Sequence, residues 1–281
     1  MKKNIKGWKY YNLAAVPTCA PHEDVDISPI VDGTIWSLRS ENGSKPLLAR
    51  YITDFDCKEE TSYWNIVKDG PFNIDELSKK YQKCVGKALE RTEVKMVDPR
   101  NCLDELYDVY QACFKTYESA DNEMTKDAFI FSVSHDGREY WAAYCKDSGQ
   151  MCGWMACERH SDWTETCVAK YHPDLQSHYR PSDAIHYTIL SYYLNELGHK
   201  YVNSGTRNIN HKTNVQDYKV KHWNFRYAYS KLHIVYNPRI KWLITISYPF
   251  RRVLSIFDNI TIVHQITSLL RMEEIVRNDK H

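Results

Sequence analysis

Side chains that could move a proton or hold an anion gather in the second half of the sequence. Glu158 and His160 follow the apolar run MCGWMAC, and either side chain could accept a proton near neutral pH. Arg180, Ser182 and Asp183 open a predicted helix, where a positive charge and the first N–H groups could hold a phosphate. An exposed strand end and an ordinary helix start are the alternatives. The sequence leaves both interpretations open.

A second group of polar residues lies between positions 207 and 218. Arg207 and His211 follow a short predicted strand, and open α/β sheets tend to bind ligands at such strand ends. We expect Arg207 to contact an anion and His211 a polar substrate. Asn214 stands at a predicted helix start, where capping is the alternative to ligand binding. Tyr218 lies within that helix and is a candidate proton donor, with packing as the alternative.

The hydrophobic pattern predicts the elements that must position these residues. The first thirty residues are expected to be irregular, and residues 33–55 to form two strands joined by a Glu-Asn-Gly-Ser turn. Helices are predicted at residues 74–89, 103–117 with Asn101 as its cap, 181–197 and 213–222. Strands are predicted at residues 92–97, 138–145, 150–158, 164–171, 199–205 and 225–236. This order predicts an α/β (α+β) fold with a mixed, mostly antiparallel central sheet flanked by helices.

Composition limits the classes of function. The 281 residues carry a formal net charge of +1, so no global field attracts nucleic acid. No uncharged run reaches the roughly 18 residues that cross a bilayer, and the N-terminus lacks the apolar core of a signal peptide, so we expect a cytoplasmic protein. The nine cysteines form no CxxC pair and no cluster with zinc spacing. We therefore expect reduced core thiols and no metal.

The most specific stretch lies near the end of the predicted sheet. It comprises Asn203-Ser-Gly-Thr-Arg207, His211 to Tyr218, Trp223-Asn-Phe-Arg226 and the strand 229–236. This stretch resembles the C-terminal signature of GNAT-like proteins related to the FemAB peptidoglycan aminoacyltransferases, in which an Asn-led helix runs into a Gly-Phe corner and the last strand. The order of elements over residues 33–236 resembles the acyltransferase fold of the GNAT superfamily.

The resemblance implies a mechanism. In the GNAT fold two neighbouring strands splay apart, and the pantetheine arm of acyl-CoA pairs with the exposed backbone like an added strand. The resemblance assigns these strands to residues 150–158 and 164–171, the base to Glu158 or His160, and the acid to Tyr218. A bulge there would point an N–H at the thioester oxygen.

The resemblance also implies a cofactor site and two departures from the family pattern. The helix after the splayed strands would hold the pyrophosphate of acyl-CoA, with Arg180, Ser182, Asp183 and Asn214 as contacts. Acetyl-CoA enzymes have a glycine-rich loop at that place, whereas residues 176–183 contain no glycine. Val220 occupies the position of the usual catalytic tyrosine, five residues before the corner phenylalanine.

Both ends of the chain are basic and aromatic. Residues 237–257 contain four basic residues and no acidic one, and four lysines precede position 10. We predict an irregular N-terminal segment (1–32), a GNAT-like domain (33–236) and a basic amphipathic helical tail (237–281). Residues 237–257 could attach to an anionic membrane surface at the inner face of the membrane. Packing of the tail against the domain or a second subunit is the alternative.

Three functions are compatible with these patterns. The first is transfer of an acyl group, most simply acetyl, from acyl-CoA to an amine such as an amino sugar of a cell-envelope or polysaccharide precursor. The second is FemAB-like aminoacyl transfer from aminoacyl-tRNA to a lipid-linked precursor, to which a lysine-rich helix face (Lys79, Lys80, Lys83 and Lys87) could contribute phosphate contacts. The third is a non-catalytic protein with a GNAT fold that binds a membrane surface.

Overall fold

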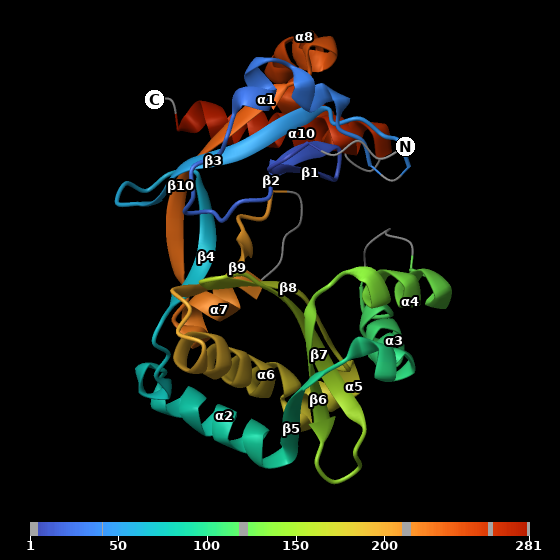
Figure 1. Ribbon diagram of the computed structural model, residues 1–281, viewed down its shortest axis with the longest axis vertical. Coiled ribbons are helices and arrows are strands. Elements are labelled where there is room, and N and C mark those ends of the chain that lie inside the picture. Colours follow the sequence, from blue (N-terminus) through green and yellow to red (C-terminus); the bar gives the residue numbers. More distant parts are fainter. Residues whose placement is uncertain (1–4, 41, 118–122, 210–214, 258–260, 280–281) are drawn as a thin grey trace. The chain divides into compact units, whose positions relative to one another are not determined.

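The computed structural model describes residues 5–40, 42–117, 123–209, 215–257 and 261–279. Contacts within the chain divide it into two compact units (Figure 1). The terminal unit comprises residues 1–65, 206–213 and 227–281, and the central unit comprises residues 66–205 and 214–226. Each unit draws on segments far apart in the sequence, and the terminal unit draws on both sides of the boundaries predicted at residues 32 and 236.

The central unit is built on a mixed sheet in which the strands follow the order β4-β9-β8-β7-β6-β5. The strands are β4 (Tyr63–Asp69, which begins in the terminal unit), β5 (Thr92–Val97), β6 (Glu139–Cys145), β7 (Met151–Arg159), β8 (Trp163–Tyr171) and β9 (Tyr201–Thr206). Strands β5 to β8 pair antiparallel, and β8 pairs parallel with β9. This antiparallel pairing of β6, β7 and β8 confirms the predicted meander. Strands β6 and β7 carry buried apolar side chains on both faces, so both faces of the sheet must be covered by helices.

Helices cover both faces of this sheet. Figure 1 shows α2, α6 and α7 on one side of it and α3 and α4 on the other. Their bounds are α2 (Lys79–Arg91), α3 (Leu103–Phe114), α4 (Lys126–His135), α5 (Pro173–Tyr179), α6 (Pro181–Leu190) and α7 (Val215–Trp223). A π-helix at Ser191–Glu196 extends α6, and short 3₁₀ turns lie at Ile74–Glu76 and Pro99–Asn101. The apolar face of α3, with Leu106 and Val109, packs on Trp154 and Ala156 of β7.

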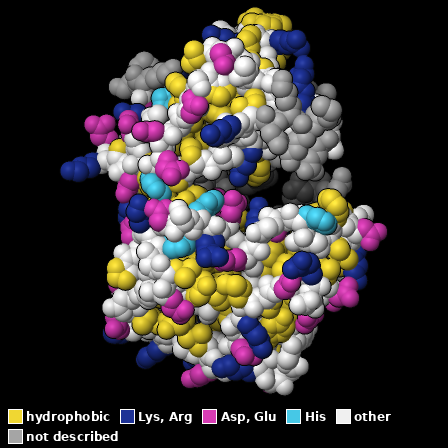
Figure 2. Space-filling model, in the orientation of Figure 1, with side chains coloured by type: hydrophobic (Ala, Val, Ile, Leu, Met, Phe, Trp, Pro, Cys, Tyr) yellow, Lys and Arg dark blue, Asp and Glu magenta, His cyan; other side chains and the backbone are white. Residues whose placement is uncertain are grey.

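The terminal unit has its own strands and a helical tail. The strands are β1 (Trp8–Tyr11), β2 (Ala14–Pro17), β3 (Leu48–Cys57) and β10 (Arg226–Tyr236), which pair in that order. The helices are α1 (Ser28–Val31), η1 (Thr34–Ser37), α8 (Pro238–Ser247), η5 (Tyr248–Phe250), α9 (Arg251–Leu254), η6 (Ser255–Phe257) and α10 (Thr261–Asn278). Helix α10 is anchored by Ile275 and Val276, which pack on Tyr63 and Leu232. Figure 2 shows hydrophobic side chains at the surface over α8.

The fold class and most elements of the central unit agree with the sequence prediction. In the N-terminal part the second strand predicted within residues 33–55 is confirmed as β3, whereas the first strand and the irregular start were wrong. Residues 8–17 form a hairpin through Asn12 and Leu13, which both have positive φ although the turn contains no glycine. Thr34–Ser37 is a 3₁₀ turn rather than a strand, because the Asp32 carboxylate accepts hydrogen bonds from the backbone N and the hydroxyl of Thr34. Cys102, not Asn101, is the N-cap residue of α3.

No helix among the described residues is both long enough and apolar enough to cross a lipid bilayer.

Candidate functional site

The candidate site lies in the central unit, where β8 and β9 part. These strands pair at Trp163–Tyr201, Thr164–Val202 and Glu165–Asn203, and their pairing stops there. By contrast, β7 and β8 stay paired from Gly153–Tyr171 to Arg159–Thr164. The assignment of the splayed strands to residues 150–158 and 164–171 was therefore wrong. A short turn holds β7 and β8 together as a hairpin, whereas helices connect β8 to β9 and leave them free to part.

A β-bulge lies two residues beyond the last pair of β8 and β9. Ala156 of β7 faces Val168 and Cys157 faces Thr166, so Cys167 is an extra residue in β8. Burial raises the pKa of the Cys167 thiol to about 11. The thiol is therefore protonated at neutral pH, which argues against a role as nucleophile.

Lys219 of α7 reaches this point from the side of α6. Its Nζ donates to the hydroxyl of Ser204 on β9 and lies 3.5 Å from the hydroxyl of Thr166 on β8. The Nζ also lies 5.7 Å from the centre of the Phe225 ring. The side chain is buried, and among the described residues no carboxylate forms an ion pair with it. Lys219 thus holds a cation between the two parting strands.

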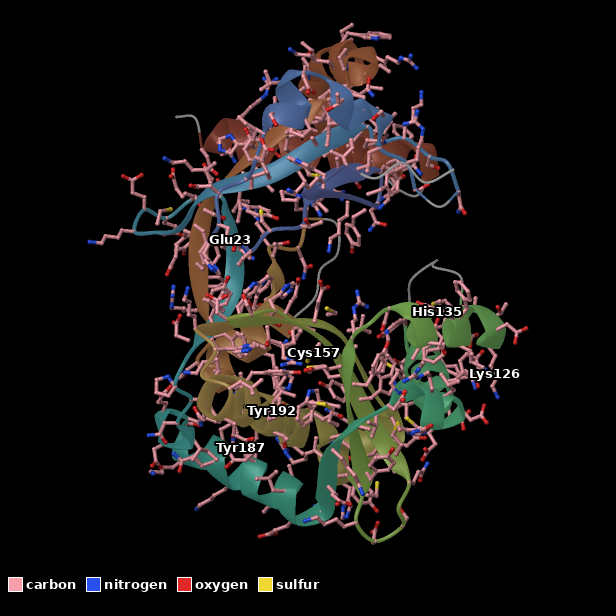
Figure 3. All side chains as sticks on the ribbon, in the orientation of Figure 1. Glu23, Lys126, His135, Cys157, Tyr187 and Tyr192 are labelled. Carbon is pink, nitrogen blue, oxygen red and sulfur yellow. The ribbon has the colours of Figure 1, made fainter. Side chains whose placement is uncertain are left out.

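Burial makes Lys219 an unusual lysine. Loss of solvation lowers its pKa to about 8, and the nearby thiol of Cys157 opposes that change. Figure 3 shows Cys157 inside the central unit, on the side of the sheet that α6 covers. Lys219 lies on this inner face because Trp223, one helical turn later, is fully buried and orients α7. A lysine that exchanges its proton near neutral pH is suited to general acid–base chemistry.

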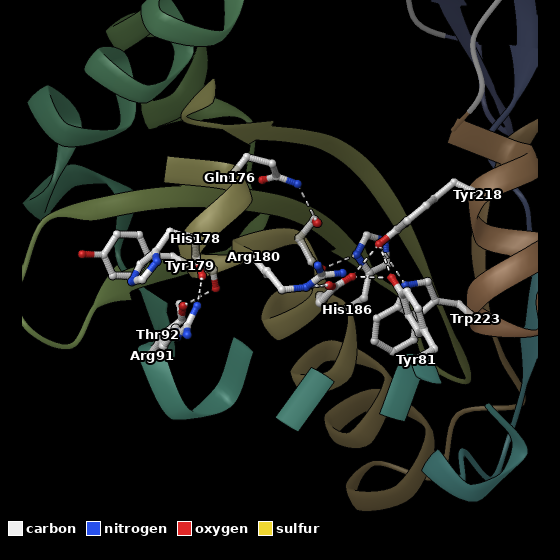
Figure 4. A network of polar contacts seen from close by, with 12 residues as sticks. Tyr81, Arg91, Thr92, Gln176, His178, Tyr179, Arg180, His186, Tyr218 and Trp223 are labelled. Atoms are coloured by element: carbon white, nitrogen blue, oxygen red, sulfur yellow. Dashed lines mark hydrogen bonds and ion pairs between the residues drawn. The ribbon is translucent and has the colours of Figure 1, made fainter. Parts of the chain in front are cut away.

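The Asp183 carboxylate at the start of α6 gathers three donors (Figure 4). The hydroxyls of Tyr81 and Tyr218 both donate to its Oδ1, at 2.6 Å for Tyr218, and the two hydroxyls also contact each other. Arg180 Nε donates to the Oδ2 atom at 2.6 Å. Burial, followed by the charge of Asp183, raises the pKa of Tyr218 to about 12. Both effects keep this phenol protonated at neutral pH.

The start of α6 is thus occupied by the protein's own groups. Asp183 is 1% exposed, and its negative charge lies where a pyrophosphate was expected. Ser182 is also buried, and its hydroxyl accepts a hydrogen bond from Gln176 Nε2 at 2.9 Å. The backbone of Arg180 has a φ of 54°. Its guanidinium forms an ion pair with Asp183, so its charge is already neutralised within the protein. Of the predicted contacts, Arg180, Ser182 and Asp183 come together with Tyr218, but as a closed internal network.

Three buried polar atoms near this network have no hydrogen-bond partner among the residues that the structure describes. They are the hydroxyl of Tyr171, Oε1 of Gln176 and Nε2 of His186. His186 Nδ1 donates a hydrogen bond to the carbonyl oxygen of Ser182 at 2.6 Å, and its ring stacks on Trp223. Burial, followed by the charge of Lys219, lowers the pKa of His186 to about 3. Its imidazole is therefore neutral at physiological pH.

Glu158 and His160 lie apart from Lys219. Their side chains approach each other to 3.7 Å, and the His160 ring stacks on Trp163 at 4.0 Å. Cys157 faces α6, so strand alternation turns Glu158 toward the opposite face of β7. The two predicted bases are therefore on the other side of the sheet from Tyr218, the predicted acid.

The remaining predicted residues lie outside this cluster. Arg207 belongs to the terminal unit, where its guanidinium donates to the carbonyl of Ser62 and stacks 4.7 Å from the Trp64 ring. His211 and Asn214 lie outside the described residues. Among the residues that are described, no group of three or more His, Cys, Asp or Glu side chains is arranged to hold a metal ion.

Sequence reasoning missed Lys219, Tyr81 and His186. One signal was available for Lys219, which precedes Trp223 by four residues and therefore shares its helix face. No local pattern links Tyr81 to Asp183, because 102 residues separate them.

Solved structures resemble this chain in fold at low sequence identity. A structure of FemX is 10% identical, with a TM-score of 0.52 over 79% of this chain and 81% of that chain. L-PGS from Bacillus licheniformis is 11% identical, with a TM-score of 0.50 over 94% and 84%. The C-terminal domain of a proposed lysylphosphatidylglycerol synthetase from Agrobacterium fabrum is 10% identical, with a TM-score of 0.51 over 85% and 82%. The chain therefore shares its fold with these three proteins.

No protein-family model and no curated protein sequence matches the chain. The likeness to FemX and L-PGS is therefore one of fold, and the chemistry has to be argued from the site. Within this fold, β8 and β9 are the strands that part, and the cation of Lys219 lies between them.

Proposed function

We propose that this protein is an acyltransferase that moves an acyl group to an amine at the place where β8 and β9 part. The observation that carries the proposal is Lys219, a buried cation held between Thr166 and Ser204 at that place. The GNAT-like fold supports the reaction class by analogy. A buried charge without an ion-pair partner costs stability, so its presence favours a functional role.

The reaction requires two proton movements. The amine nitrogen attacks the acyl carbonyl carbon, a C–N bond forms, and the carbonyl electron pair moves to oxygen. The C–O or C–S bond to the leaving group then breaks, the nitrogen loses a proton, and the leaving oxygen or sulfur gains one. A cation near the carbonyl oxygen stabilises the negative charge that develops there.

Lys219 is suited to the electrophilic part of this reaction. With a pKa of about 8 it is mostly protonated at pH 7, so it can donate to a developing oxyanion. The same pKa lets it release a proton to the leaving group more readily than an exposed lysine. The backbone of β8 at the Cys167 bulge is a second candidate donor to that oxygen. Glu158 and His160 remain proposed bases for an amine that approaches from the face of β7 opposite to α6, and Tyr218 remains a proposed acid.

The start of α6 bears on the choice of donor. A pyrophosphate there would meet the carboxylate of Asp183, and Arg180 is already paired with that carboxylate. This arrangement favours an aminoacyl ester of tRNA over acyl-CoA as donor, because the ester does not require that helix N-terminus to bind a pyrophosphate. The acceptor would be a small or lipid-linked amine, such as an amino sugar of a cell-envelope precursor.

Binding and variants test the proposal together. Isothermal titration of the full chain with CoA, acetyl-CoA and aminoacylated tRNA identifies the donor, and uncharged tRNA separates recognition of the ester from recognition of phosphate. We expect aminoacylated tRNA to bind in a salt-dependent manner and CoA to bind weakly. Tight binding of acetyl-CoA that is lost in Arg180→Ala would reverse the preference for the aminoacyl ester.

The site itself is tested with the donor that binds. Transfer to an amine acceptor should be lost in Lys219→Met and retained in Lys221→Met, whose lysine is exposed on the same helix. Full transfer by Lys219→Met would refute the proposed site.

A further inference from the structure

The segment 238–257 of the terminal unit exposes an unusual amount of apolar surface. Trp242, Ile246, Phe250, Val253, Ile256 and Phe257 are each between 50% and 75% exposed, and Leu243 is 43% exposed. Ile244 is the one residue of α8 that is buried. Large apolar side chains this numerous on consecutive short helices usually mark a surface that another phase or molecule covers.

The same segment is basic. Arg239, Lys241, Arg251 and Arg252 lie within residues 238–257, and no acidic residue does. Arg239 and Lys241 are exposed at the start of α8, and Arg252 is exposed on α9. Basic side chains beside exposed aromatic and aliphatic groups are typical of helices that lie in the interface of an anionic bilayer.

A cavity of about 330 Å³ lies within this tail, between α9 and η6 on one side and α10 on the other. Its lining residues are Arg251, Arg252, Ser255, Thr267, Leu270, Arg271 and Glu274. Three arginines and one glutamate give the lining a formal charge of +2, and Arg251 Nε lies 3.2 Å from Glu274. The planar guanidinium groups of such a cavity are suited to phosphate oxygens.

We infer that the segment 238–257 docks on an anionic lipid bilayer and that the arginine-lined cavity binds the phosphate of a lipid headgroup. The exposed apolar side chains enter the boundary between headgroups and acyl chains. Arg252 meets the phosphate layer from the cavity, while Arg251 is held in place by Glu274 and by stacking 4.4 Å from the Tyr248 ring. The combination of cationic cavity and apolar rim favours a lipid surface over a soluble anion, because a soluble anion makes no use of Trp242 or Ile256.

Sedimentation with vesicles tests this inference on the full chain. The protein should pellet with phosphatidylcholine vesicles that contain phosphatidylglycerol and much less with pure phosphatidylcholine vesicles, and added salt should weaken the binding. Quenching of Trp242 fluorescence by brominated anionic lipid should be seen in the natural chain and should be reduced in Trp242→Phe.

Two variants separate the contributions of charge and apolar surface. Arg252→Gln should weaken partitioning into anionic vesicles about fivefold, which corresponds to the usual contribution of one interfacial charge. Replacing both Phe250 and Ile256 by serine should weaken it by about tenfold or more. Arg100→Gln and Phe131→Ser are matched controls, because both side chains are exposed in the central unit, and neither should change binding.

Several outcomes would overturn the inference. These are equal pelleting with anionic and neutral vesicles, and unchanged binding of Arg252→Gln or of the Phe250 and Ile256 double variant. Displacement by inorganic phosphate, at a concentration matched to the lipid phosphate, would assign the cavity to a soluble anion instead. A dimer in analytical ultracentrifugation that the double variant abolishes would assign the surface to a second copy of the chain. Circular dichroism of each variant verifies that the fold is retained.

Discussion

The two units hold their cations in opposite ways. Lys219 in the central unit is buried between two strands, with hydroxyls and an aromatic ring as its neighbours. Arg252 in the terminal unit is exposed beside a cavity and beside exposed apolar side chains. The first arrangement costs folding free energy, whereas the second costs almost none.

This difference indicates what each cation can do. A desolvated cation acts strongly on a charge that develops next to it, because little water screens the interaction. Exposed cations act on a charged surface through attraction that salt weakens. We therefore assign chemistry to the central unit and attachment to the terminal unit. Substitutions of Lys219 and of Arg252 test this assignment through their effects on transfer, stability and vesicle binding.

The largest expected effect is on transfer by Lys219→Met. Removing a preorganised electrophilic group usually slows the chemical step by a hundredfold to a thousandfold, and we expect kcat to fall by about that factor. Initial rates with the donor identified by titration measure the effect. Lys219→Arg keeps the charge but not the shape, so it should be impaired less than the methionine variant. A Lys219→Met rate within about threefold of the natural chain would contradict the assignment of the chemistry to Lys219 in the central unit.

Acid conditions should destabilise the central unit through the buried imidazole of His186. The pKa of His186 is about 3 in the folded protein and about 6.5 in an unfolded chain, so the unfolded chain binds more protons between these values. The free energy of unfolding should therefore fall by roughly 3 kcal/mol as the pH drops from 7 to 4. Urea unfolding gives the free energy of unfolding of the natural chain and of His186→Phe at each pH. The difference between the two pH dependences measures the contribution of His186. Parallel profiles would show that His186 does not contribute to the acid sensitivity.

Alkaline conditions should relieve the cost of Lys219. Its folded pKa of about 8 lies below the value of about 10.4 for an exposed lysine, so the unfolded chain again binds more protons over this window. The free energy of unfolding contributed by Lys219 should rise by about 2 kcal/mol between pH 8 and 10. Lys219→Met should be at least as stable as the natural chain at pH 7 and should lack this rise. A Lys219→Met variant that is less stable than the natural chain would indicate that the cation supports the fold.

Removing one phenol from the Asp183 network should have a smaller effect. Tyr218→Phe takes away a donor from a buried carboxylate that keeps two others, Tyr81 and Arg180. We expect the free energy of unfolding to fall by about 1–2 kcal/mol. The kinetics of the same variant separate a structural role from a catalytic one, since a structural role lowers stability and leaves kcat unchanged. A matched loss of stability in Tyr81→Phe would support the shared network.

Sequence patterns predicted the central unit better than the terminal one. The strands of the meander were visible because their apolar runs and the Lys-Asp-Ser-Gly turn are local features. The hairpin at Asn12 and Leu13 was missed because its turn uses positive φ without glycine. The 3₁₀ turn at Thr34 depends on a side-chain hydrogen bond from Asp32, which competes with the strand propensity of Thr-Ile-Trp.

The candidate site was predicted only in part, for a different reason. Arg180, Ser182, Asp183 and Tyr218 were named from sequence and do come together, but Arg180 and Tyr218 donate to Asp183, and the Ser182 hydroxyl accepts from Gln176. Strands β8 and β9 part because helices, not a short turn, connect them along the chain. The packing of α7 on the sheet then determines which of its residues lies between the two strands. Lys219 could be named only once the parting of β8 and β9 was known.

The smallest expected effect is the change in the free energy of unfolding when the exposed Arg252 of the terminal unit is replaced. Arg252 is exposed, so Arg252→Gln should change the free energy of unfolding by less than about 0.5 kcal/mol at any pH between 6 and 10. Thermal and urea unfolding in parallel with Lys219→Met measure this difference under the same conditions. If an exposed arginine proved as important for folding as a buried lysine, the separation of chemistry from attachment would lose its physical basis. An unchanged fold with weakened vesicle binding would instead show that this cation acts on what lies outside the protein.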